Sequence, residues 1–132
     1  MRAAVLYEAN TPLVIEEIST RKPKAREVLI RTAVSGLCHS DLHFIEGLYP
    51  HPLPMVLGHE ASGIVEQVGA EVTYLQPGDH VITCLSVFCG TCENCTACRP
   101  VICSNTAFLL LPGQYDRLTW DKPQQLHTGM NL

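Results

Sequence analysis

The cysteines between residues 89 and 103 carry the clearest chemical pattern in the chain. Cys89, Cys92 and Cys95 are spaced C-x2-C-x2-C, and Cys103 follows after a longer gap. Two-residue gaps let a turning backbone point successive thiolates at one ion, and a longer loop can return a fourth ligand to complete a tetrahedron. Four thiolates leave no open coordination position, so this set predicts a structural zinc site.

Cys98 keeps a second kind of metal site open. With it the run reads C-x2-C-x2-C-x2-C before Arg99-Pro100, which is one residue short of the bacterial ferredoxin spacing C-x2-C-x2-C-x3-C-P. An iron–sulfur electron carrier is therefore the main alternative from a different class. The short spacing counts against it, and a ferredoxin would not account for the cysteine, serine and histidine residues upstream.

A second group of reactive side chains lies between residues 36 and 60, in the segments GLCHSDLH and GHE. Cysteine and histidine are both zinc ligands, so Cys38 and His59 are candidates for a catalytic zinc, which keeps three protein ligands and one open position. Ser40 and His43 are three residues apart, so one helical turn would place them on one face. A hydroxyl near the metal with an imidazole behind it offers a route for a proton leaving an alcohol.

Each of these residues also has a structural explanation when it is taken singly. A lone cysteine is most often a small buried hydrophobic residue, and a lone histidine is more often a surface or hydrogen-bonded residue than a ligand. The sequence indicates no chemistry for four others, which are His51, His80, His127 and Cys84.

One short helix and one extended loop are expected near the second group. Ser40 and Asp41 are good N-cap residues and Gly47 is a good helix stop, so we expect one or two helical turns that include Leu42–Glu46. Tyr49–Met55 contains three prolines, which exclude a helix or a central strand and predict an extended surface loop.

Short strands are expected elsewhere, and the first two form a hairpin candidate. Gly- and Pro-rich turns separate them, which predicts a small irregular β-barrel or sandwich. Pro112–Leu132 shows no clear period. The expected strands are Arg2–Tyr7, Leu13–Ile18, Glu27–Val34, Ala61–Val68 and His80–Thr83, with Leu109–Leu111 as one more.

Length and composition fit one globular domain and exclude several classes. The 132 residues allow a sizeable core. Nine basic against thirteen acidic residues give a net charge of -4, which argues against nucleic-acid binding. No apolar run approaches the roughly 20 residues that span a bilayer, and the N-terminus lacks the apolar stretch of a signal peptide. We therefore expect a cytoplasmic protein, in which clustered cysteines more often bind metal than form disulfides.

Four motifs together resemble a known family. GLCHSDLH, GHEASGIVEQVG, PGDHV and CGTCENC…C, in this order and separation, are similar to the N-terminal domain of zinc-dependent medium-chain alcohol dehydrogenases. The resemblance runs from the first strand to about Cys103. It implies a mainly β fold over residues 1–132, a GroES-like irregular β-barrel with a short helix. A structural zinc lobe at 85–104 would project from this barrel, and a poorly patterned tail would follow at 112–132.

The resemblance also implies roles for individual residues. Cys38 and His59 match two of the three catalytic-zinc ligands. Ser40 matches the residue that accepts the alcohol proton, and His43 matches the histidine that ends the relay at solvent. The other matches are Asp41 for an acid bonded to the ligand His59, Glu60 for the acid that approaches the metal during ligand exchange, His39 for a cationic contact to the cofactor pyrophosphate, and Cys89, Cys92, Cys95 and Cys103 for the structural zinc ligands.

The implied reaction is the oxidation of a small alcohol to an aldehyde or ketone, with hydride transfer to NAD or NADP. The full-length enzyme would be a homo-oligomer. Three departures from the family matter. Cys98 stands where the family usually has Gly, the third catalytic-zinc ligand falls beyond Leu132, and the dinucleotide fingerprint G-x-G-x-x-G of a Rossmann domain is absent. We therefore expect a fragment, a truncated product or a partial sequence that binds structural zinc but is inactive alone.

A second interpretation of a different class is a zinc-stabilised β-module that acts only by binding or assembly. Whether Cys38 and His59 hold metal distinguishes it from the enzyme. Zinc-free quinone reductases share the barrel, but they would need neither set of cysteines. The substrate alcohol and the choice between NAD and NADP stay open at this point.

Overall fold

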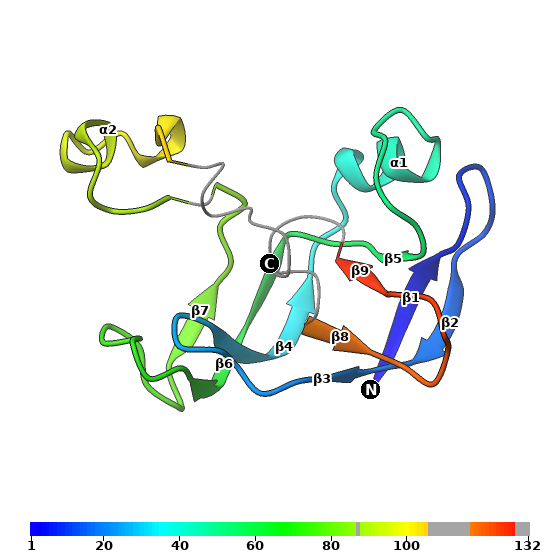
Figure 1. Ribbon diagram of the computed structural model, residues 1–132, viewed down its shortest axis with the longest axis horizontal. Coiled ribbons are helices and arrows are strands. Elements are labelled where there is room, and N and C mark those ends of the chain that lie inside the picture. The colour runs from blue at the N-terminus through cyan, green and yellow to red at the C-terminus, as the bar shows by residue number, and fades with distance from the viewer. Residues whose placement is uncertain (87, 106–116, 129–132) are drawn as a thin grey trace.

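The protein is built mainly from short β-strands, as expected (Figure 1). The computed structural model describes residues 1–86, 88–105 and 117–128. The expected strand at Leu109–Leu111 lies outside these residues. The elements in chain order are β1 (Arg2–Leu6), β2 (Val14–Glu17), β3 (Ser19–Thr20), β4 (Val28–Ser35), α1 (His39–Ile45), β5 (Met55–Val56), β6 (Ala61–Val68), β7 (His80–Ile82), α2 (Glu93–Thr96), the 3-10 helix η1 (Pro100–Ile102), β8 (Leu118–Thr119) and β9 (His127–Thr128).

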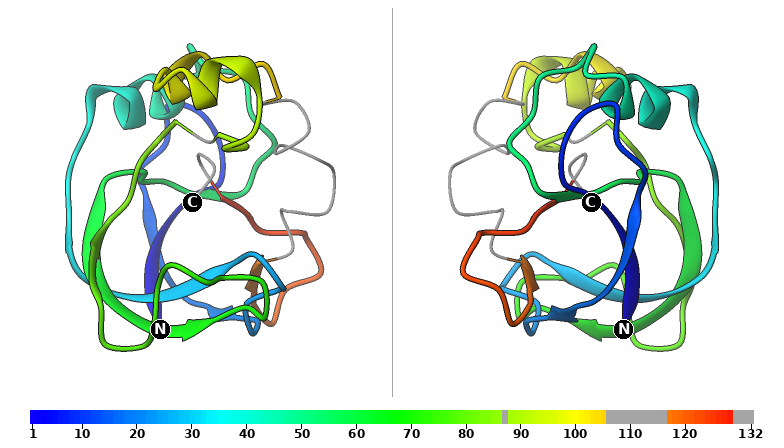
Figure 2. Two further views of the ribbon diagram at one scale, coloured as in Figure 1. Left: turned by 90° about the vertical axis from the view of Figure 1, so that its left-hand side faces the viewer. Right: turned by 90° about the vertical axis from the view of Figure 1, so that its right-hand side faces the viewer.

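The strands form three sheets over the described ranges. β1 pairs antiparallel with β2, which confirms the hairpin, and with β5, to which β9 adds in parallel. β6 pairs antiparallel with β4 and with β7, and β3 pairs with β8. The sheets are not joined into one closed ladder, but they curve around one another as in a barrel (Figure 2). The mainly β fold class is confirmed.

The pairing of β4 with β6 depends on a glycine. A Cβ atom at Gly63 would lie 2.4 Å from the carbonyl oxygen of Arg31, which faces Ile64 in the register of the two strands. Only glycine allows the two backbones to approach this closely. The ladder ends at Ser35 paired with Ala61. The residues just after Ser35 and those just before Ala61 therefore lie side by side at this end of the sheet.

Two small clusters of buried apolar side chains pack in the described part of the chain. Val5, Ile18 and Leu126 make one, and Leu6, Phe44 and Met55 make the other. Leu126 and the strands β8 and β9 come from the stretch after residue 112, where the sequence shows no period. Packing against residues far away in the sequence, rather than a local pattern, accounts for this structure. Met55 is fully buried and begins β5, so the prediction of a surface loop over Tyr49–Met55 is wrong at its end.

The helices lie at one end of the molecule, beyond the ends of the strands (Figures 1 and 2). α1 begins at His39 rather than at Leu42, because Cys38 is its N-cap and Asp41 its third helical residue. The Asp41 carboxylate accepts a hydrogen bond from the Cys38 amide at 3.1 Å. The lobe with α2 and η1 projects away from the sheets (Figure 1). Among the described residues, none of the helices has the length and apolar character to cross a membrane.

Candidate metal centres

The four cysteines singled out by their spacing lie together. The sulfur atoms of Cys89, Cys92, Cys95 and Cys103 all lie within 4.8 Å of one another. The Cys89–Cys95 and Cys92–Cys103 pairs are 3.9 Å apart, and the Cys92–Cys95 pair is 3.4 Å apart. A tetrahedral zinc with Zn–S bonds of about 2.3 Å requires sulfur atoms about 3.8 Å apart. The thiols are free, so this arrangement fits a four-thiolate metal site.

The local backbone explains how four ligands from one short segment converge. Cys92 is the N-cap of α2 and Cys95 lies within that helix, so one turn brings the two together. Cys103 ends η1, which returns the chain to α2. Cys98 is exposed and does not belong to the set. Its φ of 60° lies in the left-handed region that glycine favours.

Hydrogen bonds and burial give the thiols different acidities. Donation from the Thr91 backbone and hydroxyl, and from the Cys92 backbone, lowers the pKa of Cys89 to about 5. A backbone donor from Cys95 lowers the pKa of Cys92. Burial is the main cause that raises the pKa of Cys95 to about 11. A divalent cation would offset the cost of placing several thiolates this close, because each ligand must be deprotonated to bind it.

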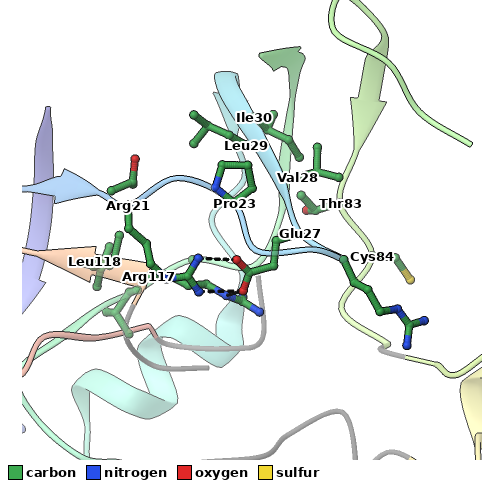
Figure 3. A pocket seen from close by; sticks show the side chains of 15 residues that line it. Arg21, Pro23, Glu27, Val28, Leu29, Ile30, Thr83, Cys84, Arg117 and Leu118 are labelled. Atoms are coloured by element: carbon green, nitrogen blue, oxygen red, sulfur yellow. Dashed lines mark hydrogen bonds and ion pairs between the residues drawn. The ribbon is translucent and has the colours of Figure 1, made fainter. Parts of the chain in front are cut away.

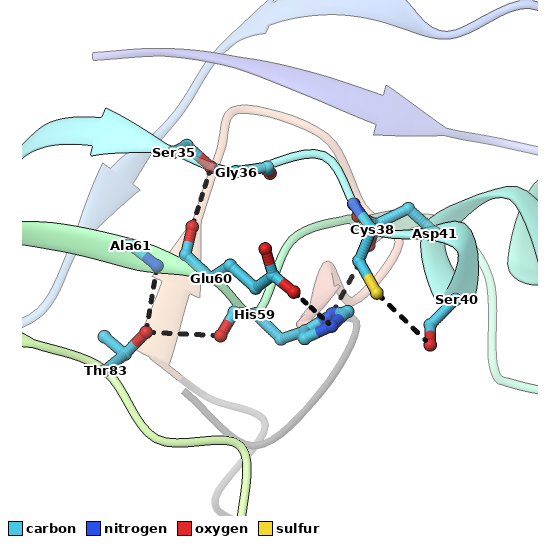
Figure 4. A network of polar contacts seen from close by, with 9 residues as sticks. All are labelled: Ser35, Gly36, Cys38, Ser40, Asp41, His59, Glu60, Ala61 and Thr83. Carbon is cyan, nitrogen blue, oxygen red and sulfur yellow. Dashed lines mark hydrogen bonds and ion pairs between the residues drawn. The ribbon is translucent and has the colours of Figure 1, made fainter.

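The second group assembles around His59, which is 4% exposed (Figure 4). Ligand atoms of Cys38, His59 and Glu60 lie within 4.8 Å of one another. The ring nitrogen Nε2 of His59 is 3.9 Å from Glu60 Oε1. Glu60 is exposed while Cys38 is half-buried. The three donors, one thiol, one imidazole and one carboxylate, are a set that zinc accepts.

The opposite side of the His59 ring faces Asp41. Asp41 Oδ1 lies 3.5 Å from His59 Nδ1, and both atoms are buried without a hydrogen-bond partner in the part of the chain that the structure describes. The backbone of His59 is held by Thr83, whose hydroxyl donates to the His59 carbonyl at 3.2 Å and accepts from the Ala61 amide at 2.9 Å. Thr83 therefore positions the histidine, and nothing in its local sequence distinguishes it.

Ser40 lies beside the thiol, with its Oγ 3.6 Å from Cys38 Sγ. His43, one helical turn further along α1, packs its ring against His39 at 4.7 Å and Tyr49 at 5.0 Å between ring centroids. The carboxylate of Glu46 lies 3.8 Å from His43 Nδ1. The two histidine rings thus meet edge to face on α1, with an angle of 75° between their planes.

A groove of about 690 Å³ opens onto this group. Cys38, Ser40, His59 and Glu60 line it on one side, whereas His39 and His43 do not. The remaining lining is largely apolar and comes from the ends of β4 and β7, the start of β6 and the residues after β7, including Val34, Ile82 and Leu85. The arrangement presents three metal-ligating side chains and a hydroxyl to a groove with largely apolar walls.

A second cavity, of about 470 Å³, was not expected from the sequence (Figure 3). Glu27 lies in its wall and accepts hydrogen bonds from Arg21 at 2.5 and 2.9 Å and from Arg117 at 3.2 Å. The bonds from Arg21 are the main cause that lowers the pKa of Glu27 to about 2. Arg117 and Glu27 are 90 residues apart in the sequence, so their bond connects the segment that begins β8 to the start of β4.

Comparisons with known proteins agree with these features. The alcohol dehydrogenase GroES-like domain family matches residues 24–129. The chain is 45% identical over 108 residues to putative alcohol dehydrogenase D of Mycobacterium tuberculosis, which covers 82% of this chain and 29% of that protein. It is 44% identical over 115 residues to the NDMA-dependent alcohol dehydrogenase of Amycolatopsis methanolica, covering 87% and 31%.

Solved structures give the same result. An alcohol dehydrogenase zinc-binding domain protein from Burkholderia ambifaria matches with a TM-score of 0.84 and 38% identity, over 98% of this chain and 36% of that one. The benzyl alcohol dehydrogenase of Acinetobacter calcoaceticus matches with a TM-score of 0.75 and 34% identity, over 98% and 35%. The chain therefore spans about a third of the length of these relatives.

Proposed function

The chain belongs to the alcohol dehydrogenase GroES-like domain family, and we propose that it supplies the zinc-binding part of a zinc-dependent, NAD(P)-linked alcohol dehydrogenase. The observation that carries this proposal is the presence of two separate groups of metal-ligating atoms, each within 4.8 Å. One group consists only of thiols, and the other combines a cysteine, a histidine and a carboxylate beside an open groove. A closed four-thiolate set suits a structural zinc, and a mixed set with an accessible side suits a catalytic one.

In this proposal Cys89, Cys92, Cys95 and Cys103 hold the structural zinc, and Cys38 and His59 hold the catalytic one with Glu60 beside it. When bound, zinc supplies Lewis-acid chemistry that acidifies an alcohol hydroxyl, and the nicotinamide supplies a hydride acceptor.

The residues around His59 prepare it as a ligand. With the ring drawn closer, Asp41 would hold the proton on Nδ1, and the lone pair of Nε2 would then face the side of Glu60. The 3.5 Å separation between Asp41 Oδ1 and His59 Nδ1 is longer than a strong hydrogen bond. A small shift of the ring on taking a ligand at Nε2 would give both buried atoms a partner, and this explains why they lack one in the described chain.

Ser40 is placed to accept the substrate proton, because its hydroxyl lines the groove beside Cys38. His43 follows on the same helix and would pass that proton towards solvent, and His39 would offer a cationic contact to the pyrophosphate of the cofactor. Val34 and Ile82 are both largely exposed along the groove, so they suit the carbon chain of a small alcohol or aldehyde and exclude water from it.

Activity requires more than the residues of this chain. Cys38 and His59 are two strong ligands, while Glu60 has a side chain that is 53% exposed to water. The relatives are about three times as long, and we propose that the remaining ligand and the nicotinamide site come from the part that this sequence does not match. The 132-residue chain alone would then oxidise no alcohol. Measurable NAD-linked ethanol oxidation by it would contradict this proposal.

Elemental analysis of the purified chain tests the metal assignment. We expect about one zinc per chain, bound by the four-cysteine group. The variant Cys92→Ser should lose this zinc, and the matched variant Cys38→Ser should keep it. Equal zinc contents in the two variants would contradict the assignment.

Two other interpretations make different predictions in the same experiment. An iron–sulfur carrier would contain iron and absorb visible light, although the exposed Cys98 does not belong to the four-cysteine group. A zinc-stabilised binding module would leave Cys38 and His59 without metal even in the longer protein. Zinc at both groups in the longer protein supports the enzyme.

A further inference from the structure

Hydrogen bonds to sulfur are distributed unevenly among the four cysteines. Cys89 Sγ accepts from the Thr91 amide at 3.4 Å and hydroxyl at 3.6 Å, from the Cys92 amide at 3.3 Å, and from the Asn105 side chain at 3.4 Å. The donors from Thr91 and Cys92 follow directly from the tight turn after Cys89. The side-chain amide of Asn105 is different, because Asn105 lies 16 residues after Cys89 in the sequence.

Asn105 contacts a second sulfur through its backbone. Its amide N–H donates to Cys103 Sγ at 3.3 Å. One residue therefore bonds both the first and the last cysteine of the group, at the point where the returning loop meets the turn at Cys89. Neither bond is needed to form α2 or η1, since Asn105 follows both elements.

Charge gives these bonds their importance. Four thiolates around one divalent cation leave a net charge of about -2 in the lobe. Donors aimed at the sulfur atoms spread this charge, and hydrogen bonds with one ionised partner are about twice as strong as neutral ones. The Asn105 amide carries two N–H groups and no charge, so it stabilises a thiolate without competing for the metal.

We propose that Asn105 is a positioning residue of the four-cysteine site, which clips Cys89 to Cys103 and stabilises the Cys89 thiolate. This inference rests on the proposed zinc site. It goes beyond that proposal because it assigns part of the metal affinity to a side chain that is not itself a ligand. It adds a second contact between the two ends of the group, beside the bond at 3.4 Å from the Cys89 amide to Cys103 Sγ.

Zinc affinity and the cobalt spectrum of the full chain test the inference. Outer-shell partners typically contribute 10- to 100-fold to metal affinity. We expect Asn105→Ala, which keeps the backbone donor, to weaken zinc binding about 10-fold in chelator competition. Asn105→Asp places a carboxylate against the thiolate and should weaken it further. Both should shift the sulfur-to-cobalt charge-transfer band of the cobalt-substituted chain, since this band responds to hydrogen bonding at sulfur.

Asn94 provides the matched control. It is an asparagine of the same lobe, but its side chain donates to the Ile102 carbonyl at 2.9 Å and to Ser104 Oγ at 3.0 Å rather than to sulfur. Asn94→Ala should therefore leave the charge-transfer band in place, even if the lobe becomes looser. A band shift in Asn105→Ala alone supports the inference.

The outcomes separate this inference from the proposal beneath it. If the parent chain binds zinc and Asn105→Ala binds it within about twofold, with an unshifted cobalt band, the role of Asn105 is overturned and the zinc site stands. The same holds if Asn105→Asp binds zinc as tightly as the parent. If the parent chain gives no tetrahedral cobalt spectrum, both the site and the inference are overturned.

Discussion

Replacement of Glu27 by glutamine should destabilise the protein in a pH-dependent way. The Glu27 carboxylate accepts bonds from Arg21, from Arg117 and from the Lys24 amide at 2.8 Å. These bonds lower its pKa from 4.5 to about 2, a difference equivalent to about 3 kcal/mol in favour of the ionised folded state. Its side chain is 20% exposed, so solvent reduces this value, and we expect Glu27→Gln to lower the free energy of unfolding by about 2 kcal/mol at pH 7.

The sign of the pH dependence follows from the lowered pKa. Because the folded pKa lies below the unfolded one, the contribution is complete above pH 4.5 and is lost as the pH falls towards 2. At pH 3 less than about half of it should remain. Denaturant unfolding of the parent and of Glu27→Gln at pH 7 and pH 3 measures both values, and thermal melting at pH 7 should show a drop of about 6–10 °C.

Glu66→Gln is the control for this experiment. Glu66 also pairs with an arginine, at 3.1 Å from Arg31, but the two side chains are 45% and 61% exposed. Exposed pairs contribute little, so this change should cost less than about 0.5 kcal/mol at either pH. The reasoning is refuted if the two variants lose the same stability at pH 7, or if the loss in Glu27→Gln is as large at pH 3 as at pH 7.

Three further changes test the core, a turn and the metal. Leu126→Ala should cost about 2–5 kcal/mol in denaturant unfolding, because Leu126 is 2% exposed in a cluster with Val5 and Ile18; a cost below about 1 kcal/mol would contradict this packing. Gly69→Ala should cost more than about 1 kcal/mol in the same assay, because its Cβ would lie 1.9 Å from the Lys24 carbonyl oxygen. Removal of zinc by a chelator should lower the melting temperature of the parent but not of Cys92→Ser, as measured by calorimetry.

The sequence predicted the longer strands well because their signals are local. Ala61–Val68 was placed at its observed bounds, and the two strands of the hairpin, β1 and β2, were found within one residue at each end. Their apolar residues alternate or cluster over enough positions to define a strand. The two-residue strands β3, β5, β8 and β9 have no such period. Met55 is buried in a proline-rich segment because distant residues such as Leu6 and Phe44 pack against it.

The candidate sites divide in the same way. The cysteine spacing favoured Cys89, Cys92, Cys95 and Cys103 as one set but left Cys98 open as a further ligand. The structure brings the four together and leaves Cys98 outside. Residue type alone made Cys38 and His59 candidate ligands. Their assignment to one zinc depended on resemblance, since a helix and a loop separate the two residues. The supporting roles of Thr83 and Asn105 were not found, because a side chain that bonds a distant backbone or sulfur atom leaves no periodic mark in a sequence. The assigned roles of Ser40, His43 and His39 stay predictions.

The first core cluster has a consequence for how the chain folds as it is made. Val5 and Ile18 are covered by Leu126, and Thr119 bonds the Ser19 carbonyl across 100 residues. Contacts this distant raise the contact order, and loops of this length must close before the contacts stabilise anything. During synthesis on the ribosome, the apolar face of the first hairpin would therefore stay exposed to solvent until residues near 126 had emerged. A chaperone that binds exposed apolar strands would bind this hairpin during that interval.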